Sequence, residues 1–260
     1  MQTTSATAAP WTQAGSDIFY TAGSVGIGTP GPIPAGQTVV TRYATLPTPR
    51  GQLACAAASA TQTIYCFGGW DGTSNLDEIV EYDPPTDTLV AKSAVLPSGR
   101  QGLACAGDTA TGKIYCFEGY DGTQLDEIVE YDLGTDTLVT KSAVLPSPSL
   151  FLGCAIDPAT GRIYCIGGSD ATGPLDQVVE YTPGTDALVT KSANLPSPRT
   201  NLGCAAGSAT QKIYCFGGWG ETGRLDEIVE YDPQADMVVT KSAILPSPRD
   251  GVACVSHPAT

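Results

Sequence analysis

Histidine is almost absent from this sequence, and that absence excludes much chemistry. The 260 residues include one histidine, His257, close to the C-terminal end. A zinc site with three histidines is therefore impossible, and so is a copper site that needs two. A Ser-His-Asp triad would have to use His257, in a position where chains commonly fray. We expect His257 to be an ordinary turn residue.

Basic residues and long apolar runs are also scarce. Lys and Arg number 13 against 27 Asp and Glu, a net charge of −14, which repels phosphate backbones, so we expect no nucleic-acid partner. No apolar run approaches the roughly 18 residues of a membrane helix, so we expect no membrane insertion. Two methionines, 30 glycines and 20 prolines favour turns over helices. The 42% of hydrophobic residues suffices for a core.

The chain repeats itself with a period of about fifty residues. An Ile-Tyr-Cys block places tyrosines at Tyr65, Tyr115, Tyr164 and Tyr214, in steps of 50, 49 and 50 residues. Each unit holds four short β-branched and aromatic runs bounded by Gly, Pro, Asp and Thr. No stretch shows a sustained helical period. Four antiparallel strands in about fifty residues are typical of one propeller blade.

The order of these blocks resembles the Kelch repeat over roughly residues 37–257: Arg, Gly-Leu-Ala, Ile-Tyr-x-x-Gly-Gly, Val-x-x-Tyr-Asp, Thr-Asp-x-x-Val. The resemblance implies an all-β fold, a Kelch-type β-propeller. Glu118 departs from it by replacing the first glycine of one pair, and Ser149 by replacing a recurrent arginine. The usual outer-strand tryptophan is replaced by Leu89, Leu138, Leu188 and Val238.

The blocks predict four complete blades, at about 50–98, 100–147, 149–197 and 199–247. Residues 249–257 predict one more innermost strand, and residues 36–46 one more outermost strand. Residues 17–23 and 24–28 fit the two middle strands, so we expect a five-bladed ring whose last blade is shared between the termini. The alternatives are a fragment of a longer propeller and closure by a neighbouring chain. We expect an N-terminal segment, 1–35, and a propeller, 36–260.

Eight of the nine cysteines form pairs on adjacent predicted strands, with ten residues between partners. The pairs are Cys55/Cys66, Cys105/Cys116, Cys154/Cys165 and Cys204/Cys215. Facing side chains there could form disulfides, which implies an oxidising, extracellular setting. Cys254 would face Thr21 and stay free. The alternative is that all nine are small core residues. We expect no metal site, because no CxxC motif or second histidine accompanies them.

The N-terminal residues carry a second resemblance. Residues 11–29 resemble a short motif of phage tail-fibre proteins and some bacterial surface proteins. Residues 1–10 lack the basic and apolar regions of a secretory signal. Gly26, Gly28 and Gly31 spell a GxGxxG motif, but three nearby prolines forbid the helix that a dinucleotide site needs. We therefore expect no cofactor.

The loops after each Gly-Gly pair are the candidate ligand site. They carry Trp70, Asp71, Tyr120, Asp121, Asp170, Trp219 and Glu221. Aromatic faces beside carboxylates suit sugar recognition at one rim of the ring. The alternative is that the aromatics cap the core between blades and the aspartates satisfy turns.

A second carboxylate series lies in the middle of predicted strands. Its members are Glu81, Glu130, Glu180 and Glu230. The nearest recurring cations are the arginines before each innermost strand and the lysines Lys92, Lys141, Lys191 and Lys241. Identical spacing in every unit indicates structural ion pairs and no catalytic residues.

Together these patterns favour a non-enzymatic extracellular or virion structural or adhesion protein. Its expected partners are a glycan or protein receptor and neighbouring subunits of a virion or surface filament. Two alternatives stay open. One is a carbohydrate-active enzyme on the Kelch fold, although the histidine-containing sites of such enzymes have no match here. The other is an intracellular protein-interaction propeller.

Overall fold

A computed structural model of the chain describes residues 19–21, 24–26, 42–58, 62–108 and 110–255. It divides into two units, Met1–Tyr43 and Ala44–Thr260. In the first unit, β1 (Phe19–Thr21) pairs with β2 (Ser24–Gly26) as an antiparallel hairpin. No helix among the described residues has the length and apolarity to cross a membrane. His257 lies outside the described residues.

The second unit is built from four-stranded antiparallel sheets, one for each sequence repeat, which we number blades one to four. The innermost strands are β3 (Ala54–Ala58), β7 (Ala104–Asp108), β11 (Gly153–Ile156) and β18 (Gly203–Gly207). The second strands are β4 (Thr63–Phe67), β8 (Lys113–Phe117), β12 (Ile163–Ile166) and β19 (Lys212–Phe216). The third strands are β5 (Glu78–Asp83), β9 (Leu125–Asp132), β15 (Gln177–Thr182) and β22 (Glu227–Asp232). The outermost strands are β6 (Thr88–Val95), β10 (Thr137–Ser149), β16 (Ala187–Asn194) and β23 (Met237–Ile244).

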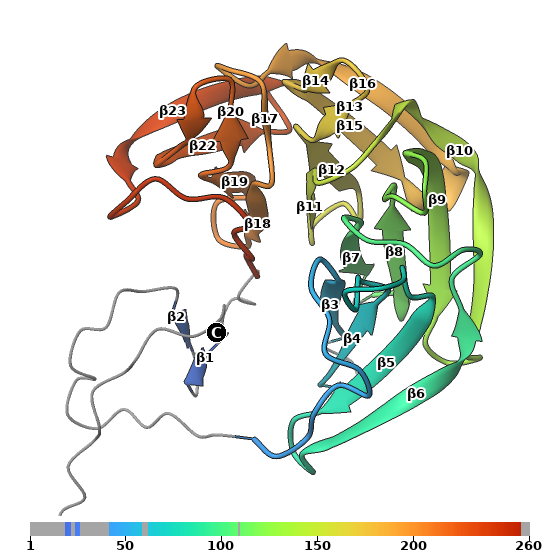
Figure 1. Ribbon diagram of the computed structural model, residues 1–260. Helices are drawn as coiled ribbons and strands as arrows, with labels where there is room; N and C mark the ends of the chain where they lie inside the picture. The colour runs from blue at the N-terminus through green and yellow to red at the C-terminus, as the bar shows by residue number, and fades with distance from the viewer. Residues whose placement is uncertain (1–18, 22–23, 27–41, 59–61, 109, 256–260) are drawn as a thin grey trace, which may run out of the picture. The chain divides into compact units, whose positions relative to one another are not determined.

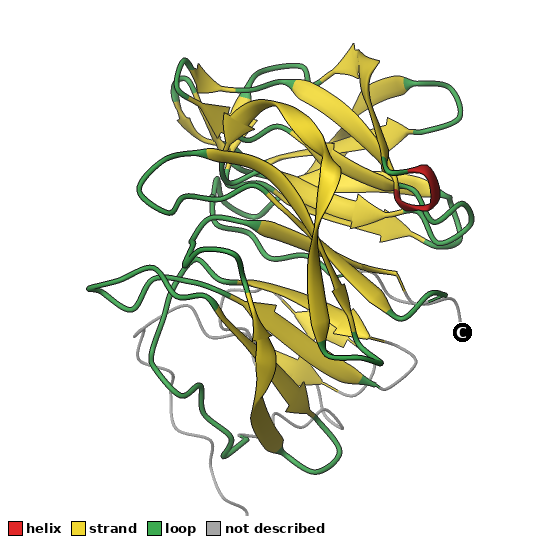
Figure 2. Cartoon of the chain, turned by 90° about the vertical axis from the view of Figure 1, so that its right-hand side faces the viewer, coloured by secondary structure: helices red, strands yellow, loops and turns green. Residues whose placement is uncertain are grey.

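Short additional elements lie in the connections of blades three and four. They are β13 (Ser169–Asp170), β14 (Gly173–Pro174), β17 (Arg199–Thr200), β20 (Trp219–Gly220), β21 (Gly223–Arg224) and the 3-10 turn η1 (Pro183–Thr185). Figure 2 shows that turn in red, and the other described residues are drawn as strands and loops. The predicted all-β class and the strand order within each blade are confirmed.

The hydrophobic core lies between successive blades (Figure 1). Phe67 and Ile79 of blade one are buried against Ile114 and Tyr131 of blade two. The Phe67 and Tyr131 rings meet edge to face, with centroids 5.7 Å apart. Equivalent clusters join blades two and three and blades three and four. Because both faces of an inner blade are covered, the run Ile128–Tyr131 on β9 is buried without alternation.

A chain of backbone hydrogen bonds links the blades just before their innermost strands. The N–H of Gly102 donates to Gln52 O (3.0 Å), Phe151 to Gly102 (2.8 Å), Asn201 to Phe151 (2.9 Å) and Gly251 to Asn201 (2.9 Å). All five residues have a left-handed backbone, with φ between 56° and 68°. We call this series the axial chain. Its last member lies beyond blade four, where the sequence predicts a further innermost strand.

Aspartates at the turns between the third and outermost strands accept hydrogen bonds from the preceding blade. Asp136 accepts the Tyr131 hydroxyl (2.9 Å) within its blade and the backbone N–H of Ser93 (2.9 Å) from blade one. Asp186 and Asp236 bind Ser142 and Ser192 in the same way. In blade one, Asp87 accepts the N–H of Ala44 (3.4 Å), as Asp136 accepts that of Ala94 (3.4 Å). This contact is the one expected if residues 36–46 end an outermost strand of another blade, although residues up to 41 lie outside the described part.

The predicted disulfides are confirmed. The four bonds are Cys55–Cys66, Cys105–Cys116, Cys154–Cys165 and Cys204–Cys215, each between residues directly opposite on the first two strands of one blade. Cys254 is a free thiol. A Cβ added to Gly203 would lie 2.9 Å from Cys254 Sγ, and one added to Gly153 would lie 2.6 Å from Cys204 Sγ. Cys254 therefore lies beside Gly203 of blade four as Cys204 lies beside Gly153 of blade three, although residues 249–255 form no strand, in contrast to the innermost strand predicted there.

The outward faces of blades one and four are less covered than the faces between blades. Ile114 and Tyr131 of blade two are 0% exposed, whereas their counterparts in blade one, Ile64 and Tyr82, are half-buried. Phe216 of blade four is likewise half-buried, whereas Phe67 is 0% exposed. The five-bladed closure stays a prediction, because the residues predicted to complete it lie partly outside the described part of the chain.

Deleting residues 1–23 should expose residues 249–255 if the N-terminal strands complete a fifth blade with them. Unpaired backbone groups and an apolar edge would then promote aggregation or strand exchange. We expect a lower melting temperature and higher oligomers by size-exclusion chromatography with light scattering. A Trp11→Ala variant controls for the lost indole, since the deletion removes it. A truncated protein that stays monomeric with an unchanged melting temperature would refute the closure.

Replacing Cys105 and Cys116 together by serine should lower the free energy of unfolding by about 2–3 kcal/mol. The bond closes a short loop, so its effect on the entropy of the unfolded chain is modest. Denaturant titration of oxidised protein measures the change. Non-reducing peptide mapping should link cysteines within single blades, and any peptide linking different blades contradicts the assignment.

Candidate functional site

The candidate site is the set of loops between the second and third strands, which we call the rim. All four loops leave their sheets at the same end, because each follows the second strand of its blade. In each blade, one loop residue pairs by backbone with the residue three positions before the start of the innermost strand; these loop residues are Trp70, Tyr120, Ser169 and the β20 residue Trp219. The rim therefore lies beside the axial chain.

Paired glycines at the base of each loop let successive blades approach closely. Gly68 and Gly69 have φ of 62° and 109°, which side-chain-bearing residues rarely adopt. A Cβ on Gly68 would lie 2.4 Å from the carbonyl oxygen of Arg100 in the next blade. The N–H of Gly69 donates to that same oxygen at 2.8 Å. The loop base of one blade is thereby held by the residues that precede the innermost strand of the next blade.

Two indole rings are exposed on the rim. Trp70 is 37% exposed and Trp219 is 41% exposed, while Tyr120 is half-buried. The Arg224 guanidinium lies 5.3 Å from the centre of the Trp219 ring, and its Nε is 2.5 Å from Asp250 Oδ1. The ion pair orients the arginine over the ring. Both tryptophans leave part of their apolar ring surface exposed, while Arg224 lies over the Trp219 ring.

The rim carboxylates stabilise their own loops. Asp71 accepts the N–H groups of Thr73 (2.8 Å) and Ser74 (2.7 Å). Asp121 accepts the N–H and hydroxyl of Thr123 (both 3.1 Å), and Asp170 those of Thr172 (2.8 and 2.6 Å). The backbone N–H groups of Ser74 and Thr73 lower the pKa of Asp71, so it is ionised at neutral pH. Glu221 is exposed at the tip of its loop. These contacts agree with the alternative that the aspartates satisfy turns.

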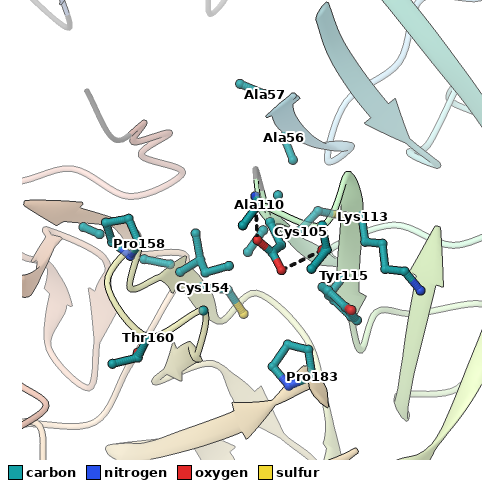
Figure 3. Close-up of a pocket in the computed structure, with 18 of the residues that line it drawn as sticks. Ala56, Ala57, Cys105, Ala110, Lys113, Tyr115, Cys154, Pro158, Thr160 and Pro183 are labelled. Carbon is teal, nitrogen blue, oxygen red and sulfur yellow. Dashed lines mark hydrogen bonds between the residues drawn. The ribbon is translucent and has the colours of Figure 1, made fainter. Parts of the chain in front are cut away.

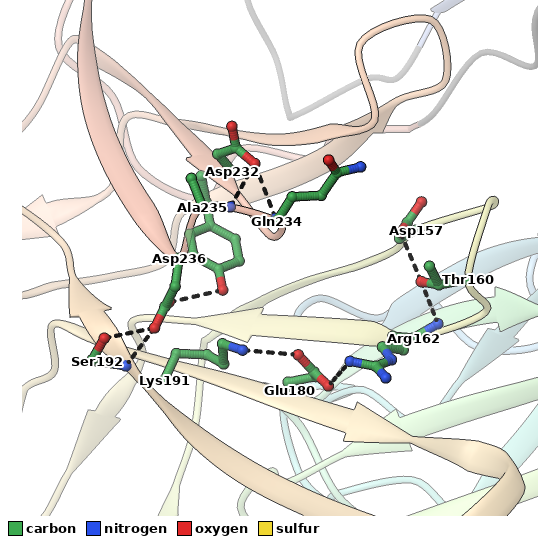
Figure 4. A network of polar contacts seen from close by, with 11 residues as sticks. Asp157, Thr160, Arg162, Glu180, Lys191, Ser192, Asp232, Gln234, Ala235 and Asp236 are labelled. Carbon is green, nitrogen blue, oxygen red and sulfur yellow. Dashed lines mark hydrogen bonds and ion pairs between the residues drawn. The ribbon is translucent and has the colours of Figure 1, made fainter.

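The mid-strand glutamates are held in ion pairs, as predicted. The Lys92–Glu81 distance is 2.8 Å, Lys141–Glu130 is 2.8 Å, Lys191–Glu180 is 3.1 Å and Lys241–Glu230 is 2.7 Å. Lys113, Arg162 and Lys212 add a second cation in blades two to four. Figure 4 shows Glu180 between Lys191 and Arg162. Hydrogen bonds from Lys241 and Lys212 lower the pKa of Glu230, which suits a structural carboxylate and does not suit a general acid.

The recurrent arginines pair with a different carboxylate series from the predicted one. Arg50 Nη2 is 2.5 Å from Glu78 Oε2, and the Arg100–Glu127 and Arg199–Glu227 distances are 3.1 and 2.7 Å. These arginine side chains are only 1% exposed. Blade three has Ser149 and Gln177 at the two positions. The joint loss of both partners from one repeat is the sequence signal that could have revealed the pairing.

A cavity of about 950 Å³ lies at the opposite end of the blades from the rim (Figure 3). The innermost strands and the turns that follow them supply small lining residues such as Ala56, Cys105, Cys154 and Pro158. The Asp108 carboxylate is satisfied by Ala110 N–H (3.0 Å) and the Thr111 hydroxyl (2.7 Å). In the described part of the chain, no three His, Cys, Asp or Glu residues are grouped to hold a metal ion.

Residues 53–88 match the family model of the Kelch motif. The match runs from just before β3 to the start of β6 in blade one. Together with the four repeated sheets, it shows that the fold is an all-β, Kelch-type β-propeller. No curated protein matches the chain.

A Gly68→Ala substitution should be far more destabilising than Gly112→Ala. Both glycines have a left-handed φ (62° and 69°), so both changes carry the conformational cost of about 1 kcal/mol. Only the Gly68 Cβ meets backbone of the next blade, whereas the Gly112 Cβ meets open space. We expect Gly68→Ala to lower the free energy of unfolding by at least about 2 kcal/mol more. Equal effects in denaturant titrations would contradict the role given to this close approach.

Proposed function

We propose that the protein is a non-enzymatic extracellular or virion surface protein whose rim binds glycans. The Kelch repeat supports a propeller that serves as an interaction domain. The observation that carries the glycan proposal is the exposure of the Trp70 and Trp219 indoles on loops whose bases are held by neighbouring blades. A rigid base and an exposed aromatic face suit stacking on a sugar ring, because little order has to be gained on binding.

The polar groups of the rim support ligand binding without catalysis. Asp71, Asp121 and Asp170 are occupied by the N–H and hydroxyl groups of their own turns. The mid-strand glutamates are neutralised by lysines. A general acid for glycoside cleavage would instead need a raised pKa beside a second carboxylate. These features favour recognition over turnover.

The proposed location follows from the cysteines and from the N-terminal resemblance. Four disulfides are compatible with an oxidising environment and disfavour the alternative of an intracellular interaction propeller. The tail-fibre-like motif at 11–29 supports a virion or surface filament, with neighbouring subunits as further partners. Most of that motif lies outside the described residues.

A glycan array probed with the wild-type protein tests the proposal. We expect binding to at least one glycan class, and a loss of at least tenfold in affinity for Trp70→Ala/Trp219→Ala, since stacking on two rings is removed. Val90→Ala, at an exposed valine of β6 away from the rim loops, is the matched control and should bind as wild type. No glycan binding by the wild-type protein would refute the proposed ligand, as would unchanged affinity of the double variant.

A further inference from the structure

Two departures from the repeat, Glu118 and Ser149, meet at the contact between blades two and three, and a third, Gln177, lies in blade three. Glu118 stands where the other blades have the first glycine of the pair. Ser149 stands where they have arginine, and Gln177 where they have the glutamate that pairs with that arginine. Glu118 and Ser149 belong to the rim base that joins blade two to blade three.

The Glu118 side chain reaches from the loop base of blade two to the entry of blade three. Its Oε2 lies 2.5 Å from the Ser149 hydroxyl, and its Oε1 accepts the N–H of Leu152 at 2.8 Å. The residue is 1% exposed. Its φ is 54°, the left-handed conformation that glycine adopts in the other blades. The carboxyl group thus forms a side-chain link between blades two and three, at the position where Ser149 replaces an arginine that forms its ion pair within its own blade in the other repeats.

Among the described residues, none forms an ion pair with this buried carboxyl group, whose hydrogen bonds come from Ser149 and Leu152. On its own blade, Glu118 N donates to the carbonyl of Glu127 (3.0 Å), whose carboxylate is already paired with Arg100 (3.1 Å). Blade three contributes the uncharged Ser149 and Leu152 to this contact. Burial raises the pKa of Glu118 to about 8, opposed only by the hydrogen bonds from Leu152 and Ser149. A buried acid without a counter-charge favours its neutral form.

We propose that Glu118 is a proton-dependent latch, which holds residues 149–152 of blade three when neutral and releases them when ionised. The neutral acid donates its proton to Ser149 Oγ and accepts Leu152 N–H, so both oxygens are satisfied. The ionised form leaves a buried negative charge that only two hydrogen bonds oppose.

Release of residues 149–152 would act on the rim. Leu150 pairs with Ser169 at the start of the blade-three loop. Phe151 is the central member of the axial chain and bonds to both Gly102 and Asn201. Opening the latch would therefore interrupt the axial chain on both sides of Phe151. This inference does not depend on the nature of the rim ligand.

The direction of the pH effect follows from linkage. The pKa of Glu118 is about 8 in the folded chain, above its ordinary value of 4.5. The stabilisation is full below about pH 4.5, is lost progressively as the pH rises to about 8, and stays lost above that. In this window the unfolding constant rises up to about tenfold per pH unit.

Denaturant titrations of the wild type and Glu118→Gln between pH 5 and pH 9 test the latch. Glutamine keeps the donor and acceptor of the neutral acid but cannot ionise. We expect the unfolding constant of the wild type relative to the variant to rise by on the order of a hundredfold or more. Asp132→Asn is the control, because N–H bonds from Thr135 and Gly134 lower the pKa of Asp132 and keep it ionised throughout. A wild-type-to-Glu118→Gln ratio that stays within about threefold across this range overturns the proposal.

Two further measurements keep the test decisive. If Glu118→Gln fails to fold, the triple variant Glu118→Gly, Ser149→Arg, Gln177→Glu rebuilds the contact of the other blades and serves as the pH-independent reference. Hydrogen exchange at Leu152 N–H, corrected for intrinsic pH dependence, should lose protection between pH 7 and pH 9 in the wild type alone. A Leu152 protection factor unchanged over that range overturns the local release.

Discussion

The packing of each blade against the next is the interaction on which this structure depends. A four-stranded sheet with two apolar faces has no stable existence by itself, so burial is achieved only between blades, as between Phe67 and Tyr131. The other recurring features serve the same contact. The Gly-Gly pair lets backbones approach, the axial chain joins successive entries, and Asp136 ties its turn to the outer strand of blade one.

The residues that hold the blades together differ from those exposed on the rim, so the exposed rim residues can vary. The residues that hold the blades together lie at the loop bases, whereas Trp70 and Trp219 lie further along and are exposed. A repeat can therefore exchange Trp for Tyr or Ser at these positions without losing its contact to the next blade. Blade three shows that even a base position can change, provided that its partners change with it. Blade three lacks the Arg–Glu ion pair because it has Ser149 and Gln177, and the Glu118 carboxyl group of blade two bonds to Ser149.

Local regularity explains what could be predicted from the sequence. The strands, the disulfides and the Lys92–Glu81 type of ion pair join neighbouring strands of one blade, so their spacing recurs along the chain. The Arg50–Glu78 pair crosses a loop, and the position of Glu118 depends on the following blade, so the period did not reveal either contact. Gln52 and Phe151 adopt a left-handed backbone although neither is glycine, so the sequence gives no sign of this conformation. The aromatic loops were identified, but their use as a ligand site and the closure of the ring stay predictions.

The most direct test of this account concerns the two ends of the axial chain. Four links run from Gln52 to Gly251, each from the N–H of one blade to the carbonyl of the blade before. If blade-to-blade contact governs the whole molecule and five blades close the ring, the N–H of Gln52 must bond to the carbonyl of Gly251. Trans-hydrogen-bond scalar couplings, measured by NMR on the deuterated full-length protein, report these links individually. The account predicts a fifth coupling, between Gln52 N and the Gly251 carbonyl carbon, beside the four internal ones. Four internal couplings without the fifth would contradict it.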